Sequence, residues 1–323
     1  MATYKELKGL TIQTVAGDPS NLVDGLIWYS STTKKIRGSK LAAAAWASGG
    51  NLNSNRYRGG GGGCGTRDAA LIFGGYSTSL PGYLANAEQY NGTSWTEGPM
   101  ADYPSVTGDA GQCGTQTAAL GVGGSSTSWV DEVYEGDGSS WTAGGDYPSV
   151  TNRTGVAGTQ TAALSAGGAG PGYDQIVSCF EYDGSSWTSG GNYPQGTSNV
   201  GIAGIQTAAI AQCGYDPGGS DSSEAATYNG TAWTAITDTS NDRGEHGWST
   251  TGTTSDTMAF GIGNTEKWDG SSWTEIADNS ASRTSGFSVG TTSAALYAGG
   301  NPGGVVTTEE FDHSIGAVTF TSS

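Results

Sequence analysis

The chain has 323 residues, 56 of them glycine, with 35% hydrophobic residues and a formal net charge of −17. This excess of negative charge repels phosphate backbones, so the composition argues against nucleic acid as a partner. The sequence has no apolar run long enough to cross a bilayer and no signal-peptide pattern at its start, so we expect no membrane insertion.

The first 50 residues contain four short segments with strand character, at residues 11–15, 27–30, 35–38 and 43–46. They predict that residues 1–50 form either a degenerate repeat unit or a separate docking segment.

The beginning of the chain is also basic. Residues 1–67 carry only three acidic residues, which gives a local net charge of +6. A basic segment on an acidic chain favours a docking surface for an acidic neighbour or for a further copy of the chain. The alternative is that it neutralises the chain's own acidic part. Nine of the thirteen lysines and arginines lie here: Lys5, Lys8, Lys34, Lys35, Arg37, Lys40, Arg56, Arg58 and Arg67.

From residue 64 onward two signatures alternate. The first is a Gly-Thr-Gln-Thr-Ala-Ala-Leu pattern, which appears in variant form at residues 64–71 and then at 113–120 and in later units. The second is Asn/Asp-Gly-Ser/Thr-Ser/Ala-Trp-Thr, and its tryptophans are spaced by 46, 46, 46 and 40 residues. A period of this size predicts a repeat architecture. The tryptophans are Trp95, Trp141, Trp187, Trp233 and Trp273.

Each unit contains four short strand-like segments and no apolar period of 3.6 residues. Dipeptides such as Asn91-Gly92 and Asp183-Gly184 accept positive φ, so they predict a tight hairpin between the third and fourth strands. The fold class is therefore all-β, a β-propeller of four-stranded antiparallel blades. Seven units of 46 residues account for 322 of the 323 residues, which favours seven blades, with stations also at Trp46 and Val318. Six blades plus an N-terminal segment is the alternative.

The glycine pair after the second strand and the tryptophan of the fourth resemble kelch-type propeller repeats, which we assign to residues 51–323. The segments 8–13 and 18–33, followed by the Gly-Thr-Gln-Thr-Ala-Ala-Leu repeats, resemble tail-fibre and other virion proteins of marine bacteriophages. The resemblance implies a virion protein displayed outside the cell, with other virion proteins or further copies of itself as partners.

Catalytic residues are not evident. The two histidines, His246 and His313, stand in dissimilar contexts, and the aspartate of Asp183-Gly184 is explained by its hairpin. The four cysteines have no zinc or disulfide spacing, and small buried thiols are the favoured interpretation for Cys64 and Cys113, which occupy the same place in successive units. We therefore expect no enzyme activity and no cofactor or metal, with a polysaccharide-degrading enzyme that uses loop carboxylates as an alternative.

The loops between the second and third strands vary most between units, and function in repeat proteins usually lies where units vary. Their aromatic residues stand among Ser, Asp and Gly, a mixture suited to the apolar faces and hydroxyls of sugars. We predict that they bind a host-surface glycan, and the net charge favours a neutral or amino sugar; a purely structural subunit is the alternative. The candidate residues are Tyr76, Tyr83, Trp129, Tyr173 and Tyr215, whereas Tyr103, Tyr147 and Tyr193 are predicted to be packing residues.

Overall fold

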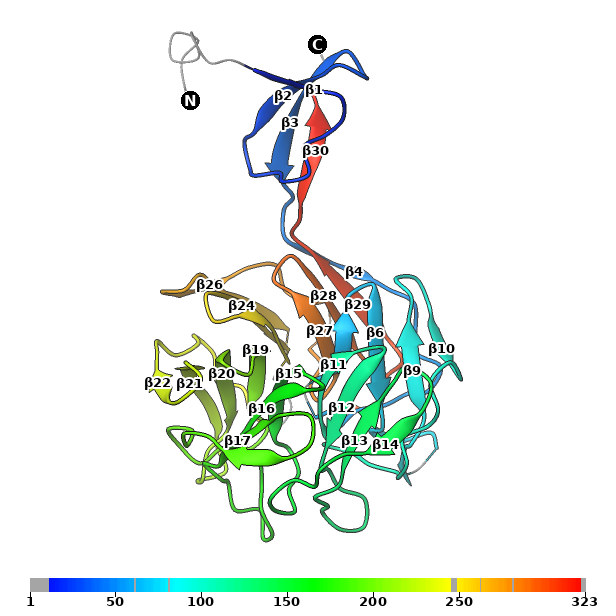
Figure 1. Ribbon diagram of the computed structural model, residues 1–323, viewed down its shortest axis with the longest axis vertical. Coiled ribbons are helices and arrows are strands. Elements are labelled where there is room, and N and C mark those ends of the chain that lie inside the picture. Colours follow the sequence, from blue (N-terminus) through cyan, green and yellow to red (C-terminus); the bar gives the residue numbers. More distant parts are fainter. Residues whose placement is uncertain are drawn as a thin grey trace. The chain divides into compact units, whose positions relative to one another are not determined.

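The structure is a computed structural model that describes residues 12–60, 62–80, 82–244, 249–261, 263–280 and 282–320 (Figure 1). Every helix or strand in these ranges is a β-strand, which confirms the all-β prediction. The described part of the chain has no helix that could cross a membrane. The chain divides into two compact units: unit 1 is Met1–Ala44 with Asp312–Ser323, and unit 2 is Ala45–Phe311.

Unit 1 contains one four-stranded sheet built from both ends of the chain. β1 runs parallel to β2, and the other two pairings are antiparallel. The loop before β2 closes on β3, because the N–H of Ser39 donates to the carbonyl of Leu26 at 2.8 Å and its hydroxyl accepts from the N–H of Leu26 at 3.0 Å. The strands, in sheet order, are β1 (Gln13–Val15), β2 (Ile27–Ser30), β3 (Lys35–Leu41) and β30 (Ile315–Thr319).

The two faces of this sheet differ. Trp28 on one face is fully buried, whereas Ile27 and Ile36 on the other are more than 40% exposed. Ile27 pairs with Gly38 and Gly38 pairs with Val318, so these residues share a face. The ring of Phe320, itself 55% exposed, lies over Gly38. Unit 1 therefore presents an apolar sheet face, made of Ile27, Ile36, Val318 and Phe320.

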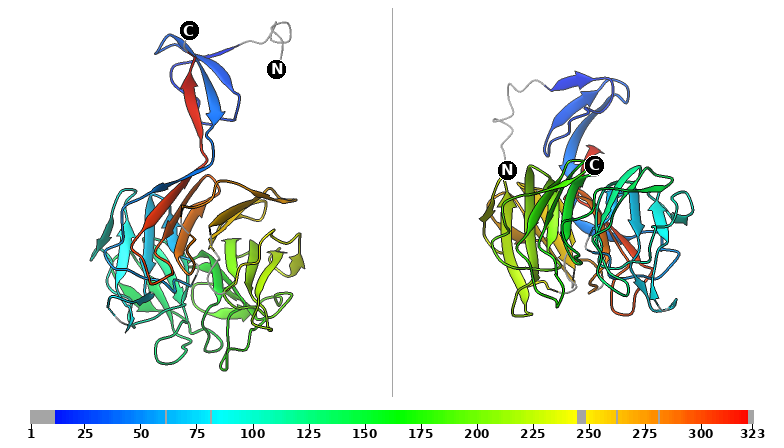
Figure 2. Two further views of the ribbon diagram at one scale, coloured as in Figure 1. Left: turned by 180° about the vertical axis from the view of Figure 1, so that it is seen from behind. Right: turned by 60° about the horizontal axis from the view of Figure 1, so that its bottom comes forward.

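The described residues of unit 2 form six four-stranded sheets, which we number I to VI in chain order (Figures 1 and 2). Sheet I is β5 (Cys64–Thr66), β6 (Ala69–Phe73), β9 (Ala87–Tyr90) and β10 (Trp95–Glu97). Sheet II is β11 (Gly111–Thr115), β12 (Ala118–Val122), β13 (Val133–Gly136) and β14 (Trp141–Ala143). Sheet III is β15 (Gly155–Thr159), β16 (Ala162–Ala166), β17 (Cys179–Tyr182) and β18 (Trp187–Ser189).

The second half of unit 2 follows the same order. Sheet IV is β19 (Gly201–Ile205), β20 (Ala208–Tyr215), β21 (Asp221–Tyr228) and β22 (Trp233–Ala235). Sheet V is β23 (Ser249–Thr253), β24 (Asp256–Gly261), β25 (Asn264–Trp268) and β26 (Trp273–Glu275). Sheet VI is β27 (Phe287–Thr291), β28 (Ala294–Ala298), β29 (Thr308–Asp312) and β4 (Ala45–Ser48). A short hairpin, β7 (Tyr76–Ser77) and β8 (Gly82–Tyr83), projects from sheet I between β6 and β9.

Two strand pairings differ from the sequence prediction. The four N-terminal segments are strands as expected, but β4 joins sheet VI and does not pair with β3. β30, which contains Val318, joins β3 and is not the fourth strand of a last repeat. The reason is that Trp46 takes the place of a fourth-strand tryptophan, packing on Phe260 and Phe311 with ring centroids 5.1 and 5.2 Å away. Residues 45–50 consequently belong to unit 2, and residues 312–323 to unit 1.

The repeated signatures join each sheet to the one before it. The indole N–H of Trp141 donates to the carbonyl of Ala101 at 3.0 Å, and the same bond recurs from Trp187 to Gly145 at 3.1 Å. The Gln of the first signature acts similarly, since the amide of Gln160 donates to two carbonyls of sheet II. The tryptophan and glutamine side chains that recur in the repeat therefore hold neighbouring sheets together.

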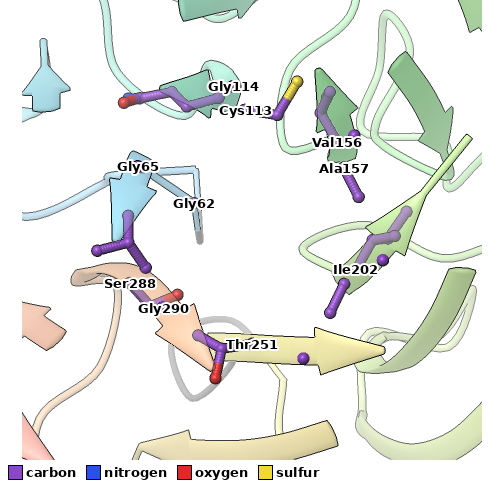
Figure 3. A pocket seen from close by; sticks show the side chains of 17 residues that line it. Gly62, Gly65, Cys113, Gly114, Val156, Ala157, Ile202, Thr251, Ser288 and Gly290 are labelled. Atoms are coloured by element: carbon purple, nitrogen blue, oxygen red, sulfur yellow. The ribbon is translucent and has the colours of Figure 1, made fainter. Parts of the chain in front are cut away.

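Sheet I is joined to sheet VI by contacts of the same kind. The indole N–H of Trp95 donates to the hydroxyl of Thr308 at 2.9 Å, and the hydroxyl of Tyr90 donates to Glu310. The first strands β5, β11, β15, β19, β23 and β27 each lie beside the next, and β27 also lies beside β5. They border a hollow of about 150 Å³ that is lined by small residues such as Gly65, Cys113 and Ala157 (Figure 3).

Candidate functional site

The candidate site contains a recurring backbone motif, a non-glycine residue with positive φ that precedes the first strand of several sheets. Arg58, Asp109, Arg153, Asn199 and Ser285 all have φ between 55° and 62°, a conformation that non-glycine residues rarely adopt. The N–H of Asp109 donates to the carbonyl of Arg58, that of Arg153 to Asp109, and that of Asn199 to Arg153, each at 2.9 Å. These bonds place residues from consecutive sheets side by side.

The side chains of this row carry opposite charges. Oδ2 of Asp109 lies 3.4 Å from Nη1 of Arg58 and 3.7 Å from Nε of Arg153. The carboxylate of Asp109 is nearly buried, whereas the side chain of Arg58 is 31% exposed. Burial is the largest single influence on Arg58 and lowers its pKa, but Asp109 and the neighbouring tyrosines Tyr83, Tyr57 and Tyr173 together outweigh it, so the pKa is raised. Two guanidinium groups therefore share the carboxylate of Asp109.

Aromatic rings lie against both arginines. Nη1 of Arg58 donates to the hydroxyl of Tyr83 at 3.0 Å, and the guanidinium carbon of Arg153 lies 5.7 Å from the ring centroid of Tyr173. Tyr173 in turn meets Trp129 edge to face, with centroids 5.0 Å apart and planes at 84°. These contacts fix the orientation of the guanidinium planes.

The loops leave two neighbouring hollows. The first, of about 140 Å³, is the arginine hollow, and Arg58, Tyr83, Ser125–Trp129, Asn152, Arg153 and Tyr173 line it. The second, of about 340 Å³, is the apolar hollow, lined by Ser128, Trp129, Val150, Pro171 and Gly172. Ser128 and Trp129 line both hollows, so the two are adjacent.

The structure brings together four of the five aromatic residues predicted from the sequence. Tyr83, Trp129 and Tyr173 line the arginine hollow. Tyr76 pairs with Tyr83 across β7 and β8 and meets its ring edge to face at 5.3 Å, so it supports the wall from behind. Tyr215 lies at the end of β20, opposite Asp221, and belongs to neither hollow as the described residues form them.

The charged residues of the site were not identified from the sequence. Arg58 was grouped with the basic N-terminal segment, but it belongs to unit 2, as do Arg56 and Arg67. Arg56 is fully buried in an ion pair with Glu88 at 2.6 Å. Aligning the repeat units would have pointed to Arg58, Asp109 and Arg153, because these residues occupy equivalent positions before successive sheets. Of the other basic residues, Lys5 and Lys8 lie outside the described residues, and Lys34, Lys35, Arg37 and Lys40 are in unit 1.

The packing assignments are confirmed. Tyr103, Tyr147 and Tyr193 are at most 3% exposed. The four cysteines are buried and free, and burial raises the pKa of Cys64 to about 12 and that of Cys179 to about 11. They are Cys64, Cys113, Cys179 and Cys213.

Possible metal ligands were also compared with the geometry. In the described ranges no group of three or more His, Cys, Asp or Glu residues could hold a metal ion. Oδ1 of Asp216 accepts hydrogen bonds from the N–H groups of Gly218 and Ser220, so a turn accounts for this aspartate. His246 lies outside the described residues.

Comparison with known proteins gives no match, either to a protein-family model or to a curated protein.

Proposed function

We propose that unit 2 is a kelch-like β-propeller whose six blades are sheets I to VI. The contacts that support this are the succession of first strands, with β27 beside β5, and the bond from Trp95 to Thr308. β4 would then close the ring, because it is the first strand of unit 2 in the sequence and pairs with β29 in the last sheet. In this proposal unit 1 is a separate module and the number of blades is six, in place of the seven favoured by the sequence.

The propeller, as we propose, binds a host-surface glycan without acting on it chemically. The observation that carries this proposal is the grouping of Tyr83, Trp129 and Tyr173 with the polar groups of Ser125–Ser128 and Asn152 around one hollow. Ring faces stack on the apolar side of a sugar, while hydroxyl and amide groups bond to its hydroxyls. On the strength of the resemblance to phage virion proteins, we propose that this binding occurs on a tail or fibre, outside the cell.

A glycan array with the intact protein tests this proposal. Trp129→Ala should weaken binding of any recognised glycan at least tenfold, about 1.4 kcal/mol, because it removes a wall of both hollows. Tyr215→Ala is the matched control and should leave binding unchanged. A wild-type protein that binds no glycan, or a Trp129→Ala variant that binds normally, would overturn the proposal.

A second candidate function is that of a structural subunit, and the apolar sheet face of unit 1 favours it. The partner that fits best is a further copy of this chain, for reasons of charge. Unit 2 has seven basic and 26 acidic residues, a net charge of −19, whereas unit 1 presents exposed Lys34, Lys35 and Lys40. Lysines around an apolar face would be drawn to the acidic unit 2 of a neighbour.

Sedimentation velocity tests whether the chain associates with further copies of itself. We expect the full chain to self-associate at low salt, and the double variant Ile36→Ser, Phe320→Ser to remain monomeric. If the wild-type chain is monomeric at all concentrations and associates only with another virion protein, the self-association proposal is wrong.

A further inference from the structure

We propose that the apolar hollow recognises a sugar that carries a methyl group, while the arginine hollow contacts hydroxyl groups of the same glycan. The methyl group belongs either to an N-acetyl substituent or to a deoxy sugar of the fucose type. This inference rests on the proposed glycan binding and names the class of glycan that the loops of unit 2 would select. It keeps the neutral sugar that the net charge favours.

The walls of the apolar hollow offer carbon and few hydrogen-bonding groups. Trp129, Val150 and Pro171 line it with an indole, a branched aliphatic side chain and a pyrrolidine ring. The polar side-chain groups among its lining residues are the hydroxyl of Ser128 and the indole N–H of Trp129. A sugar hydroxyl pressed against the carbon walls would lose hydrogen bonds to water, whereas a methyl group would gain from the same burial. The hollow therefore favours a sugar with a methyl group.

The arginine hollow has the opposite chemistry. Its wall carries four hydroxyl side chains, at residues 125–128, and the side-chain amide of Asn152. Such groups both donate to and accept from sugar hydroxyls. Ser128 and Trp129 line both hollows, so one glycan can place hydroxyls in the first and a methyl group in the second. With about 340 Å³ against about 140 Å³, the apolar hollow also has the room for the bulkier, substituted sugar.

Backbone pairing fixes the walls of the apolar hollow before a ligand binds. A bridge between Val130 and Thr151 joins the loop that carries Trp129 to the loop that carries Val150. The turn at residues 170–173, which supplies the remaining wall, is closed by its own backbone hydrogen bond of 3.0 Å. A hollow formed in advance loses little conformational entropy on binding, so a small chemical difference between two ligands appears in their affinities.

The repeat contains an internal comparison for Val150. The tetrapeptide Tyr-Pro-Ser-Val occurs twice, ending at Val106 and at Val150. Val106 is 48% exposed and lines neither of the two hollows, whereas Val150 is partly buried and lines the apolar hollow. The same local sequence thus contributes to this hollow only in the unit where Trp129 and Pro171 line it too. Val106 is therefore the matched control for Val150.

Saturation-transfer NMR and calorimetry on the full chain test the inference with two matched pairs of trisaccharides. The first pair is a chitin trisaccharide with N-acetyl groups or with N-formyl groups in their place. The second pair is a trisaccharide of L-fucose or of L-galactose with the same linkages. In at least one pair the methyl-bearing member should bind about tenfold more tightly than its partner, and its methyl protons should receive the strongest saturation. The pair that shows the preference identifies the source of the methyl group.

Val150→Thr tests the position of the methyl group, because it exchanges one methyl group of the wall for a hydroxyl at nearly the same size. The preference should fall at least about threefold. Binding of the partner that lacks the methyl group should persist, which also shows that the variant folds. Val106→Thr should behave as wild type.

If neither pair shows a preference while the array contains recognised glycans, the inference is overturned and glycan binding stands. The inference also fails if Val150→Thr keeps the full preference. Should that variant in addition associate less in sedimentation velocity, the hollow takes a side chain of a further copy instead. An empty array together with no binding of any probe would overturn the proposed function itself.

Discussion

At the residue scale, Tyr173 holds a large side chain in a strained backbone conformation. Tyr173 is 60% exposed and has a φ of 66°, so neither burial nor local preference accounts for a tyrosine there. An L-residue with a bulky side chain is disfavoured in this region, and glycine is not. The backbone strain at Tyr173 therefore lowers the stability of the turn, whereas its side chain contributes to the proposed glycan binding.

We predict that Tyr173→Gly separates the two. The variant loses the ring that meets Trp129 and Arg153, so glycan binding should fall about tenfold. Relief of strain should keep the free energy of unfolding unchanged or raise it by up to about 1 kcal/mol. Ser285→Gly relieves the same conformation outside the hollow and should leave binding unchanged. A variant that is both less stable and still able to bind would contradict the assignment.

The buried cysteines give a second prediction at this scale. Because the thiolate is the reactive form, burial that raises the pKa of Cys64 to about 12 and that of Cys179 to about 11 makes both inert near neutral pH. A thiol reagent should find almost no reactive cysteine in the native protein at pH 8 and all four after denaturation. Rapid labelling of the native protein would show that these positions open to solvent.

At the scale of strands and loops, local pattern predicted where strands form but not every partner. The segments that became β1 to β4 were located to within a few residues, because strand residues and turn residues alternate there. The partner of β4 is β29, which is about 260 residues away, and nothing in the local pattern of Ala45–Ser48 specifies it. The aromatic residues of the hollow were found because the loops vary. Arg58 and Arg153 were missed because their pairing through Asp109 depends on contacts between sheets.

The fourth-strand tryptophans differ in burial. Trp95 is 5% exposed and bonds to Thr308, whereas Trp187 is only partly buried. We predict that Trp95→Ala lowers the free energy of unfolding by about 3–5 kcal/mol and Trp187→Ala by about 2 kcal/mol. Denaturant titration measures both. A loss below about 1 kcal/mol at Trp95 would show that the indole is not what joins sheets I and VI.

The buried Arg–Glu pairs predict how the sheets respond to acid. Burial raises the pKa of Glu266, but the hydrogen bond from the N–H of Ser240 and the charge of Arg243 outweigh it, so the pKa lies below its ordinary value of 4.5. A lowered pKa means that the stabilisation is complete above about pH 4.5 and is lost as the pH falls through the folded-state pKa. Glu266→Gln should be less stable than wild type at pH 7 and lose less stability between pH 5 and pH 3. Glu275→Gln, on an exposed residue of the neighbouring strand, is the control.

At the scale of the whole molecule, the N-terminal part of the chain contributes strands to both units. Residues before β4 and after β29 form the sheet of unit 1, while β4 itself completes sheet VI. If sheets I to VI form the proposed ring, its closure depends on one short strand, because loss of β4 leaves the edge of β29 without a partner. An unpaired sheet edge promotes association with other chains. A truncation that also removes β4 should therefore lower the stability of unit 2 much more than one that removes residues 1–44 and 312–323 alone.

We predict that two truncated chains behave differently. Residues 45–311 retain β4 and Trp46 and should be monomeric, with a cooperative thermal transition close to that of unit 2 in the full chain. Residues 50–311 lack both, so Phe260 and Phe311 lose the indole that packs on them. This shorter chain should melt at a lower temperature and aggregate. Light scattering and calorimetry compare the pair directly. If the two fragments melt alike and stay monomeric, β4 does not close the ring and the proposed six-bladed arrangement is wrong.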